Sequence, residues 1–183
     1  MDGAPLTLVV CAAPLAERAG EFAATIGRVG WQVLVVATPA AAAWVDEEDV
    51  RGATGRALAV DFRRSNEPKR GPRPTVVVIC PLTFNTLNKF AAGISDTYAL
   101  GVLNEALAAG TPIVAVPFVS DRLWRHPAVR PNIDRLAAAG VMFVDPQTGQ
   151  LGANPVRPGT GPQVAEAFEP AWLVARVGRA SLA

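Results

Sequence analysis

The chain has 183 residues, half of them hydrophobic, and its formal net charge at pH 7 is +1. This length allows one domain with a sizeable core, and the small net charge indicates no polyanionic partner such as a nucleic acid. No apolar run approaches the roughly 20 residues of a membrane span, and no basic, apolar leader opens the chain, so a cytoplasmic protein without a membrane partner is expected.

The few cysteines and histidines limit the possible chemistry. Cys11 and Cys80 both end apolar runs, so they are interpreted as small core residues in a reducing compartment rather than as a disulfide. With His126 as the single histidine, the sequence offers no set of metal ligands at the usual spacing.

Two apolar runs flank a helical pattern at the start of the chain. Residues 6–11 and 31–37 are predicted to be buried strands, and residues 14–29 a helix. Thr38 is predicted to cap an Ala-rich helix whose first residue is Pro39. This βαβ pattern predicts parallel strands joined by a right-handed crossover.

The next stretch is polar. Residues 46–49 are an acidic run expected to face solvent, and residues 57–62 are predicted to be a short third strand. Residues 63–74 are rich in proline and charge, which excludes regular helix or a central strand. They are predicted to form a long loop, and loops of that length are usually functional or mobile.

The central segment combines an apolar strand, a polar turn and a helix. Residues 76–80 are typical of a strand buried on both faces, Pro81 is expected to end it, and helical spacing continues to Ile94. The turn carries small polar side chains: Thr83, Asn85 and Thr86. Open α/β sheets bind ligands at such turns, where free N–H groups and hydroxyls suit phosphate oxygens. Simple capping of the helix by Thr83 or Asn85 is the alternative interpretation.

The remaining pattern alternates in the same way. The predicted elements are helices at 97–109 and 164–177, the latter interrupted at Pro170, a helix kinked at Pro127 that finishes over 132–139, and strands at 112–116 and 141–144. The sequence therefore predicts an α/β fold, a single doubly wound, three-layer domain with a parallel sheet of about five or six strands.

Residues 81–86, Pro-Leu-Thr-Phe-Asn-Thr, are followed by Asn88-Lys89 and by residues 93–96. This motif resembles the Pro-Ala-Ser-Ala-Asn-Thr signature of the homo-oligomeric flavin-containing cysteine decarboxylases. That family includes phosphopantothenoylcysteine decarboxylase and the peptidyl-cysteine decarboxylases of lanthipeptide synthesis. The resemblance runs from about residue 6 to residue 145. It implies a flavodoxin-like, Rossmann-like fold that binds FMN, or in some members FAD, at a subunit interface, usually in trimers.

The resemblance also implies a set of cofactor contacts. They are Thr38, Thr83, Asn85, Thr86 and Asp96, with Ala13 acting through its backbone. The Gly-Ser pair that holds the flavin phosphate in family members falls here on residues 12–13, Ala-Ala, so the serine hydroxyl is lost. Thr38 matches a hydroxyl that faces the phosphate, although capping explains it equally well. Because one phosphate-binding region is visible, FMN is expected, with FAD as the alternative.

The catalytic histidine of the family has no counterpart at its usual place. Counting back from the signature proline places that position on Glu67, and Asp61 is the other acidic candidate. A carboxylate there is a base near neutral pH only if burial raises its pKa, and a solvated loop carboxylate is the alternative. His126 lies beside Pro127 and is interpreted as structural rather than as a general base.

Residues 117–124 resemble the family's Pro-x-Met-Asn-x-x-Met-Trp motif. Ser120 replaces the asparagine that holds the substrate carboxylate in the decarboxylases, and one hydroxyl cannot reproduce an amide's paired donor and acceptor. Residues 147–162 match a flap over the substrate but lack the family's flap cysteine. Residues 1–183 are thus expected to form one flavoprotein domain, with its core at 6–145, a flap at 147–162 and a C-terminal helical segment at 163–183.

Three functions are compatible with these residues. The first is flavin-dependent oxidation or decarboxylation of a cysteine-bearing small molecule or peptide, with Glu67, Asp61 or Ser120 in the catalytic site. The second is a flavin-dependent oxidoreductase with an unrelated substrate. The third is a non-catalytic flavin binder or regulatory subunit. In each case a homotrimer or higher homo-oligomer is expected from the resemblance, and a partner chain could complete the site.

Overall fold

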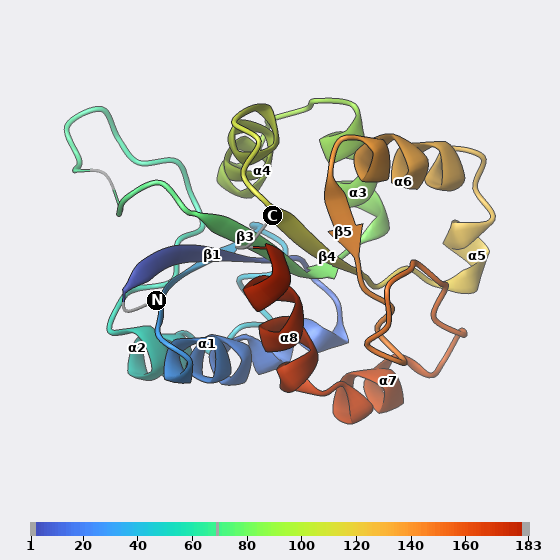
Figure 1. Cartoon of the computed structure of the whole chain (residues 1–183), viewed down its shortest axis with the longest axis horizontal. Helices are drawn as coiled ribbons and strands as arrows, with labels where there is room; N and C mark the ends of the chain where they lie inside the picture. The colour runs from blue at the N-terminus through green and yellow to red at the C-terminus, as the bar shows by residue number, and fades with distance from the viewer. Residues whose placement is uncertain (1–2, 69, 181–183) are drawn as a thin grey trace.

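Five apolar runs of the sequence form one parallel sheet in the order β2-β1-β3-β4-β5 (Figure 1). The computed structural model describes residues 3–68 and 70–180, so residues 181–183 of the expected C-terminal segment lie outside the described residues. The strands are β1 (Ala4–Val10), β2 (Trp31–Ala37), β3 (Val76–Leu82), β4 (Ile113–Pro117) and β5 (Val141–Phe143). This is the flavodoxin-like strand order, and the expected doubly wound α/β fold is confirmed.

Helices cover both faces of the sheet (Figure 1). One face carries the 3-10 helix η1 (Pro14–Arg18), α1 (Ala19–Arg28), α2 (Glu47–Thr54), α7 (Gly161–Ala167) and α8 (Pro170–Ala180). The other carries α3 (Phe84–Ala91), α4 (Tyr98–Ala108) and α6 (Val129–Ala138), and the short α5 (Asp121–Trp124) follows β4. The C-terminal helical pattern is indeed divided in two at Pro170. No helix in the described ranges has both the length and the apolar character needed to cross a bilayer.

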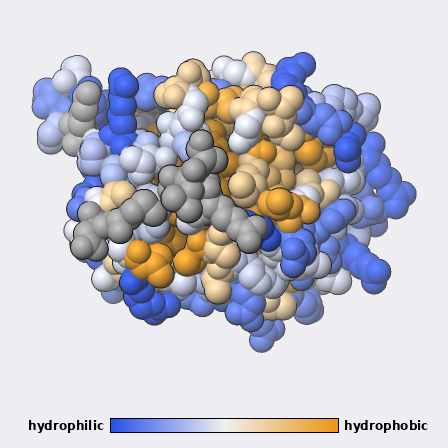
Figure 2. Space-filling model, in the orientation of Figure 1, coloured by the Kyte–Doolittle hydropathy of each residue, from blue (hydrophilic) through white to orange (hydrophobic). Residues whose placement is uncertain are grey.

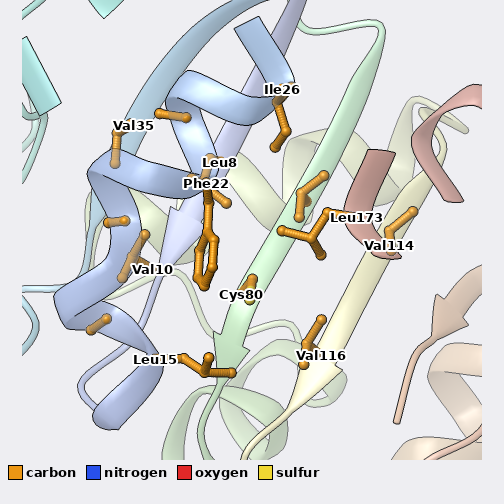
Figure 3. Close-up of a cluster of buried hydrophobic side chains, with 14 of the residues drawn as sticks. Leu8, Val10, Leu15, Phe22, Ile26, Val35, Cys80, Val114, Val116 and Leu173 are labelled. Atoms are coloured by element: carbon orange, nitrogen blue, oxygen red, sulfur yellow. The ribbon is translucent and has the colours of Figure 1, made fainter. Parts of the chain in front are cut away.

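The core lies in two layers because successive strand residues point to opposite faces. Along β3, Val78 and Cys80 pack with the α1 and α8 layer, whereas Ile79 packs with the α3, α4 and α6 layer. Figure 3 shows the first layer, in which Phe22 of α1 and Leu173 of α8 lie against the strands. Burial on both faces explains why the strands are continuously apolar rather than alternating. Cys11 and Cys80 are both free and buried, as expected.

The prediction of an Ala-rich helix that starts at Thr38 is wrong. Residues 39–45 form turns, and the helix begins at Glu47 instead, with Asp46 at its N-cap. The Asp46 carboxylate accepts hydrogen bonds from the backbone N–H groups of Glu48 and Asp49, at 2.8 and 3.1 Å. A side-chain cap and an acidic first turn stabilise a helix start, so local capping outweighs the helix propensity of the alanines. The residues of the acidic run, 46–49, face solvent as expected.

The prediction of a strand at 57–62 is also wrong, because Ala59 is the only one of these residues that pairs with the sheet. Its backbone makes two hydrogen bonds to β2, with Ala37 and Val35, as an isolated bridge. The long loop at 63–74 is confirmed, since no helix or strand occurs among its described residues. It projects from the body of the protein (Figure 1), and Figure 2 shows that its surface is hydrophilic.

Several boundaries differ from the sequence-based expectation. β3 continues through Pro81 to Leu82 across a cis Cys80–Pro81 peptide bond, so Pro81 does not end the strand. The helix after it stops at Ala91, which leaves Ile94 outside the helix and 43% exposed. The helix that was expected to pass Pro127 with a kink and to finish over residues 132–139 begins at Val129 instead and ends at Ala138.

Helix α8 contacts the turn that follows β5, residues 145–149. The buried Asp145 carboxylate accepts hydrogen bonds from the backbone N–H groups of Gln147 and Thr148 and from the Asn154 amide. Arg176 of α8 donates to the Gly149 carbonyl at 2.7 Å. Gly149 has φ of +66°, and a Cβ there would lie 2.3 Å from the Trp172 ring.

Gly149→Ala is therefore expected to lower the free energy of unfolding by about 2–4 kcal/mol, from a left-handed backbone and from overlap with the Trp172 ring. Gly55→Ala is the matched control, because Gly55 has φ of +69° but no atom within 4 Å of a Cβ. It should cost about 1–2 kcal/mol. Urea titration followed by circular dichroism measures both, and equal losses would show that the contact with α8 contributes nothing.

Candidate functional site

A pocket of about 710 Å³ lies where the strands β1 to β4 end. The chain leaves β1 for the α1 face and leaves β3 for the α3 face, so neighbouring connections diverge at this point. Such a switch point is where open α/β sheets bind ligands. The volume is within the range of roughly 300–1,000 Å³ typical of small-molecule sites.

Six of the residues singled out in the sequence line this pocket. They are Ala13, Thr38, Thr83, Asn85, Thr86 and Ser120. They come from the segments after four different strands, so the fold brings together residues that are far apart in the sequence.

Thr38 presents a free hydroxyl to the pocket. Its backbone N–H donates to the Val10 carbonyl at 2.9 Å, and the residue is only 8% exposed. Within the described residues its hydroxyl has no hydrogen-bond partner. Since no helix starts at Thr38, the capping interpretation of this side chain is wrong, and the hydroxyl is available to a ligand.

The start of α3 opens onto the same pocket. Thr83 occupies the N-cap position with extended backbone, but its side chain makes no capping hydrogen bond. The first intrahelical bond runs from Leu87 N to the Thr83 carbonyl at 2.8 Å. Asn85 is exposed in the first turn, whereas Thr86 is buried. The N–H groups of this first turn and the amide of Asn85 can therefore bind an acceptor-rich ligand.

A buried thiol lies beneath these hydroxyls. Cys11 follows β1 and forms hydrogen bonds with Thr86 and Thr83. Burial raises the pKa of the Cys11 thiol, and those hydrogen bonds offset part of the rise. Burial also raises the pKa of Cys80, partly offset by the charge of Arg18. Both thiols are therefore protonated and unreactive in the folded chain.

The three acidic candidates lie outside the pocket lining of this chain. Asp96 forms an ion pair with Lys89, which does line the pocket, and Thr97 rather than Asp96 caps α4. Glu67 and Asp61 are exposed in and beside the long loop, and the Glu67 carboxylate accepts a hydrogen bond from the Arg64 backbone N–H at 3.0 Å. A carboxylate must be buried to act as a base near neutral pH, and within a single chain Glu67 and Asp61 are exposed.

His126 also lies outside the pocket lining. Its Nδ1 accepts a hydrogen bond from the Ala128 backbone N–H at 3.1 Å, and its ring packs edge-on against Phe84 with centroids 5.4 Å apart. These contacts agree with the structural interpretation of this residue.

Sequence reasoning missed two large side chains in the pocket. Trp44 lines it from the turns that replace the expected helix, and it is 41% exposed. Arg157 lines it from the Gly- and Pro-rich segment expected to be a flap. The only signal for Trp44 was a lone aromatic side chain in an Ala-rich stretch, and Arg157 gave none beyond its place in the flap.

Comparison with known proteins places the site in context. The model of the family described as Flavoprotein matches residues 3–163. The chain is 40% identical over 72 residues to the coenzyme A biosynthesis bifunctional protein CoaBC of Thermococcus kodakarensis, and 27% identical over 141 residues to that of Mycolicibacterium smegmatis. These matches cover 39% and 75% of this chain but 18% and 33% of the relatives, so the chain spans about a third or less of their length.

A solved structure is similar over nearly the whole chain. The FMN-dependent cysteine decarboxylase SpaF superposes with a TM-score of 0.66 at 27% sequence identity. The superposition covers 94% of this chain and 97% of SpaF.

The two buried thiols predict a falling stability at high pH. An unfolded thiol ionises near pH 8.5, while the folded state keeps both protons. Above that pH the unfolded state binds fewer protons, so the free energy of unfolding falls by up to about 1.4 kcal/mol per pH unit for each thiol. Urea titrations from pH 7.5 to 10, under reductant, should show a steeper fall for the natural protein than for C11A/C80A. Parallel curves would contradict the burial of the thiols.

Proposed function

The chain belongs to the flavoprotein family, and on that premise we propose that it binds FMN in the pocket at the β1–β3 switch point. We further propose a flavin-dependent oxidoreductase or decarboxylase-like enzyme that acts on a cysteine-bearing or related small substrate in the cytoplasm. The observation that carries the proposal is the convergence of Thr38, Asn85 and the open N-terminus of α3 on one pocket.

The donor set fits a flavin mononucleotide. The Thr38 hydroxyl and the backbone N–H of Ala13 supply donors for a phosphate, and the first turn of α3 with Asn85 supplies donors for acceptor groups of the ring or ribityl chain. Most of the exposed area in the pocket belongs to apolar atoms, as a planar ring system requires. FMN is favoured over FAD because the pocket offers one such phosphate region. Bound flavin would supply a two-electron acceptor.

The catalytic groups are proposed to come from more than one chain. Ser120 lines the pocket and offers one hydroxyl to a substrate. Glu67 and Asp61 lie in or beside the projecting loop, so either carboxylate can act as a base only where that loop reaches the pocket of another copy. We therefore propose a homotrimer or larger homo-oligomer with composite sites, in which Asp96 acts on the cofactor through its ion pair with Lys89.

A non-catalytic flavin binder or regulatory subunit is the second candidate. One observation favours it: among the described residues that line the pocket there is no carboxylate and no histidine, and Lys89 and Arg157 are the only charged ones. Because Lys89 is held in an ion pair with Asp96, the lining offers no free carboxylate or imidazole for proton transfer, although it can still hold a cofactor.

Asn85→Ala is expected to weaken FMN binding about tenfold, the effect of losing one hydrogen bond of roughly 1.4 kcal/mol. Gln32→Ala is the matched control, because Gln32 is an exposed amide on β2 outside this pocket. It should bind FMN as the natural protein does. Titration of the flavin-free proteins with FMN, followed by flavin fluorescence, measures the affinities. Full FMN affinity in Asn85→Ala would show that Asn85 is not a cofactor residue.

Anaerobic mixing of the FMN-loaded protein with a cysteine-terminated peptide separates the two candidates. Bleaching of the flavin absorption supports the enzyme. A stable oxidised spectrum, with FMN bound, supports the non-catalytic binder.

A further inference from the structure

Two segments that are far apart in the sequence line the pocket side by side. Ala12, Ala13 and Pro14 follow β1, and residues 156–159 lead into α7, which begins at Gly161. A Cβ on Gly161 would lie 3.3 Å from Pro14 Cγ, so the two segments are in close contact. The start of α7 therefore lies beside the backbone that is proposed to bind the flavin phosphate.

Helix α7 has little to stabilise it on its own. It has seven residues, about two turns, and helices of that length are marginal without tertiary contacts. The Thr160 hydroxyl, at its N-cap position, donates to the Arg157 carbonyl at 2.9 Å instead of capping the helix. The position of α7, and of the pocket segment that leads into it, therefore depends on contacts with other elements.

Arg18, the last residue of η1, supplies such contacts where α7 ends. Its Nη1 donates to the carbonyl of Ala165 and, at 2.8 Å, to the carbonyl of Phe168. The last carbonyls of a helix have no partner within the helix, so a cation that donates to them stabilises its end. Arg18 thus holds α7 at the end opposite to its contact with Pro14.

The Arg18 guanidinium is itself held in one geometry. Its Nε and Nη2 donate to the two carboxylate oxygens of Glu21, at 2.7 and 2.9 Å. It also lies over the Phe22 ring, 5.4 Å from the centroid, and Phe22 packs edge-on against Phe168 with centroids 5.5 Å apart. Because the guanidinium is planar and paired on one side with a carboxylate, its remaining nitrogen stays directed at α7.

The short helix η1 joins these contacts to the pocket. The Ala16 N–H donates to the Ala13 carbonyl at 2.7 Å, and η1 runs from Pro14 to Arg18. Its first residue contacts the start of α7 and its last residue holds the end of α7. A ligand that fixes the turn at Ala13 will therefore also restrict α7.

We propose that Arg18 is a positioning residue that couples the turn at Ala13 to α7, so that a ligand bound at Ala13 and the folded α7 stabilise each other. Arg18 lies outside the pocket lining and acts on the ligand through η1. Such a coupling is reciprocal: the factor by which folded α7 favours FMN equals the factor by which FMN favours folded α7. This inference rests on the proposed binding of FMN with its phosphate at Ala13 and Thr38.

Hydrogen exchange of the α7 amides, followed by mass spectrometry, tests the coupling in the natural protein. Saturating FMN should slow exchange over residues 161–168 about fivefold or more, since coupling factors are typically at least of that size. Riboflavin has the same ring and ribityl chain but no phosphate, so at saturation it should slow this exchange less.

Arg18→Gln should remove the response. Residues 161–168 should then exchange rapidly with or without FMN, and the FMN affinity should fall about fivefold or more while the riboflavin affinity changes little. A general loss of stability would instead weaken both ligands equally. Arg18→Lys, which keeps a cationic donor, should retain part of the response. Arg28→Gln is the matched control and should respond as the natural protein does, because Arg28 is an exposed arginine of α1 that donates to Thr25 of the same helix.

Each other result overturns the proposal in a recognisable way. If FMN binds and the exchange of α7 is unchanged, or if Arg18→Gln responds to FMN as the natural protein does, Arg18 does not couple the two segments. Equal slowing by FMN and riboflavin shows that the coupling does not run through the phosphate end, and an equal loss in Arg28→Gln shows a general effect of charge. If Arg18→Gln does not fold, Arg18→Lys and the comparison of FMN with riboflavin decide. A protein that binds no FMN contradicts the proposed function, whereas bound FMN with an unresponsive α7 contradicts this inference alone.

Discussion

The divergence of the chain at the ends of β1 and β3 is the constraint on which the rest of the structure depends. Both strands are buried on both faces, so each must be followed by a helix on one side or the other. Because one connection turns to the α1 face and its neighbour to the α3 face, a pocket opens between them. The pocket is thus a consequence of how the helices cover the two faces of the sheet. The residues that line it are available to bind a ligand.

The pocket can bind a polar ligand because polar side chains that line it do not cap the helices beside them. Thr38 caps no helix, the Thr83 hydroxyl contacts Thr86 instead of capping α3, and the Ser120 side chain does not cap α5. Unused donors beside a buried, apolar sheet are costly unless water or a ligand satisfies them. The buried, protonated Cys11 thiol contacts Thr83 and Thr86.

Periodicity made the strands, the two-face burial and the polar turn at Thr83 predictable, because these features depend on local sequence. The failures came from a local helix cap that the alanine-rich composition concealed, and from contacts distant in the chain. Alanine-rich composition suggested a helix at Thr38, but the Asp46 cap moved the helix start and placed Trp44 in the pocket. Glu67 was assigned by counting along a loop, and no local pattern could show that Val156, next to Arg157, would pair with Ser120 after β4.

The most direct measurement of the central claim is the visible absorption spectrum of the protein as purified, followed by release and chromatography of any chromophore. A flavin spectrum with FMN as the released compound is the expected result, because the pocket holds donors for one phosphate and an apolar lining for a ring. A colourless protein that also fails to bind added FMN would contradict it. The divergent strand ends would then hold a pocket of this shape for a different ligand.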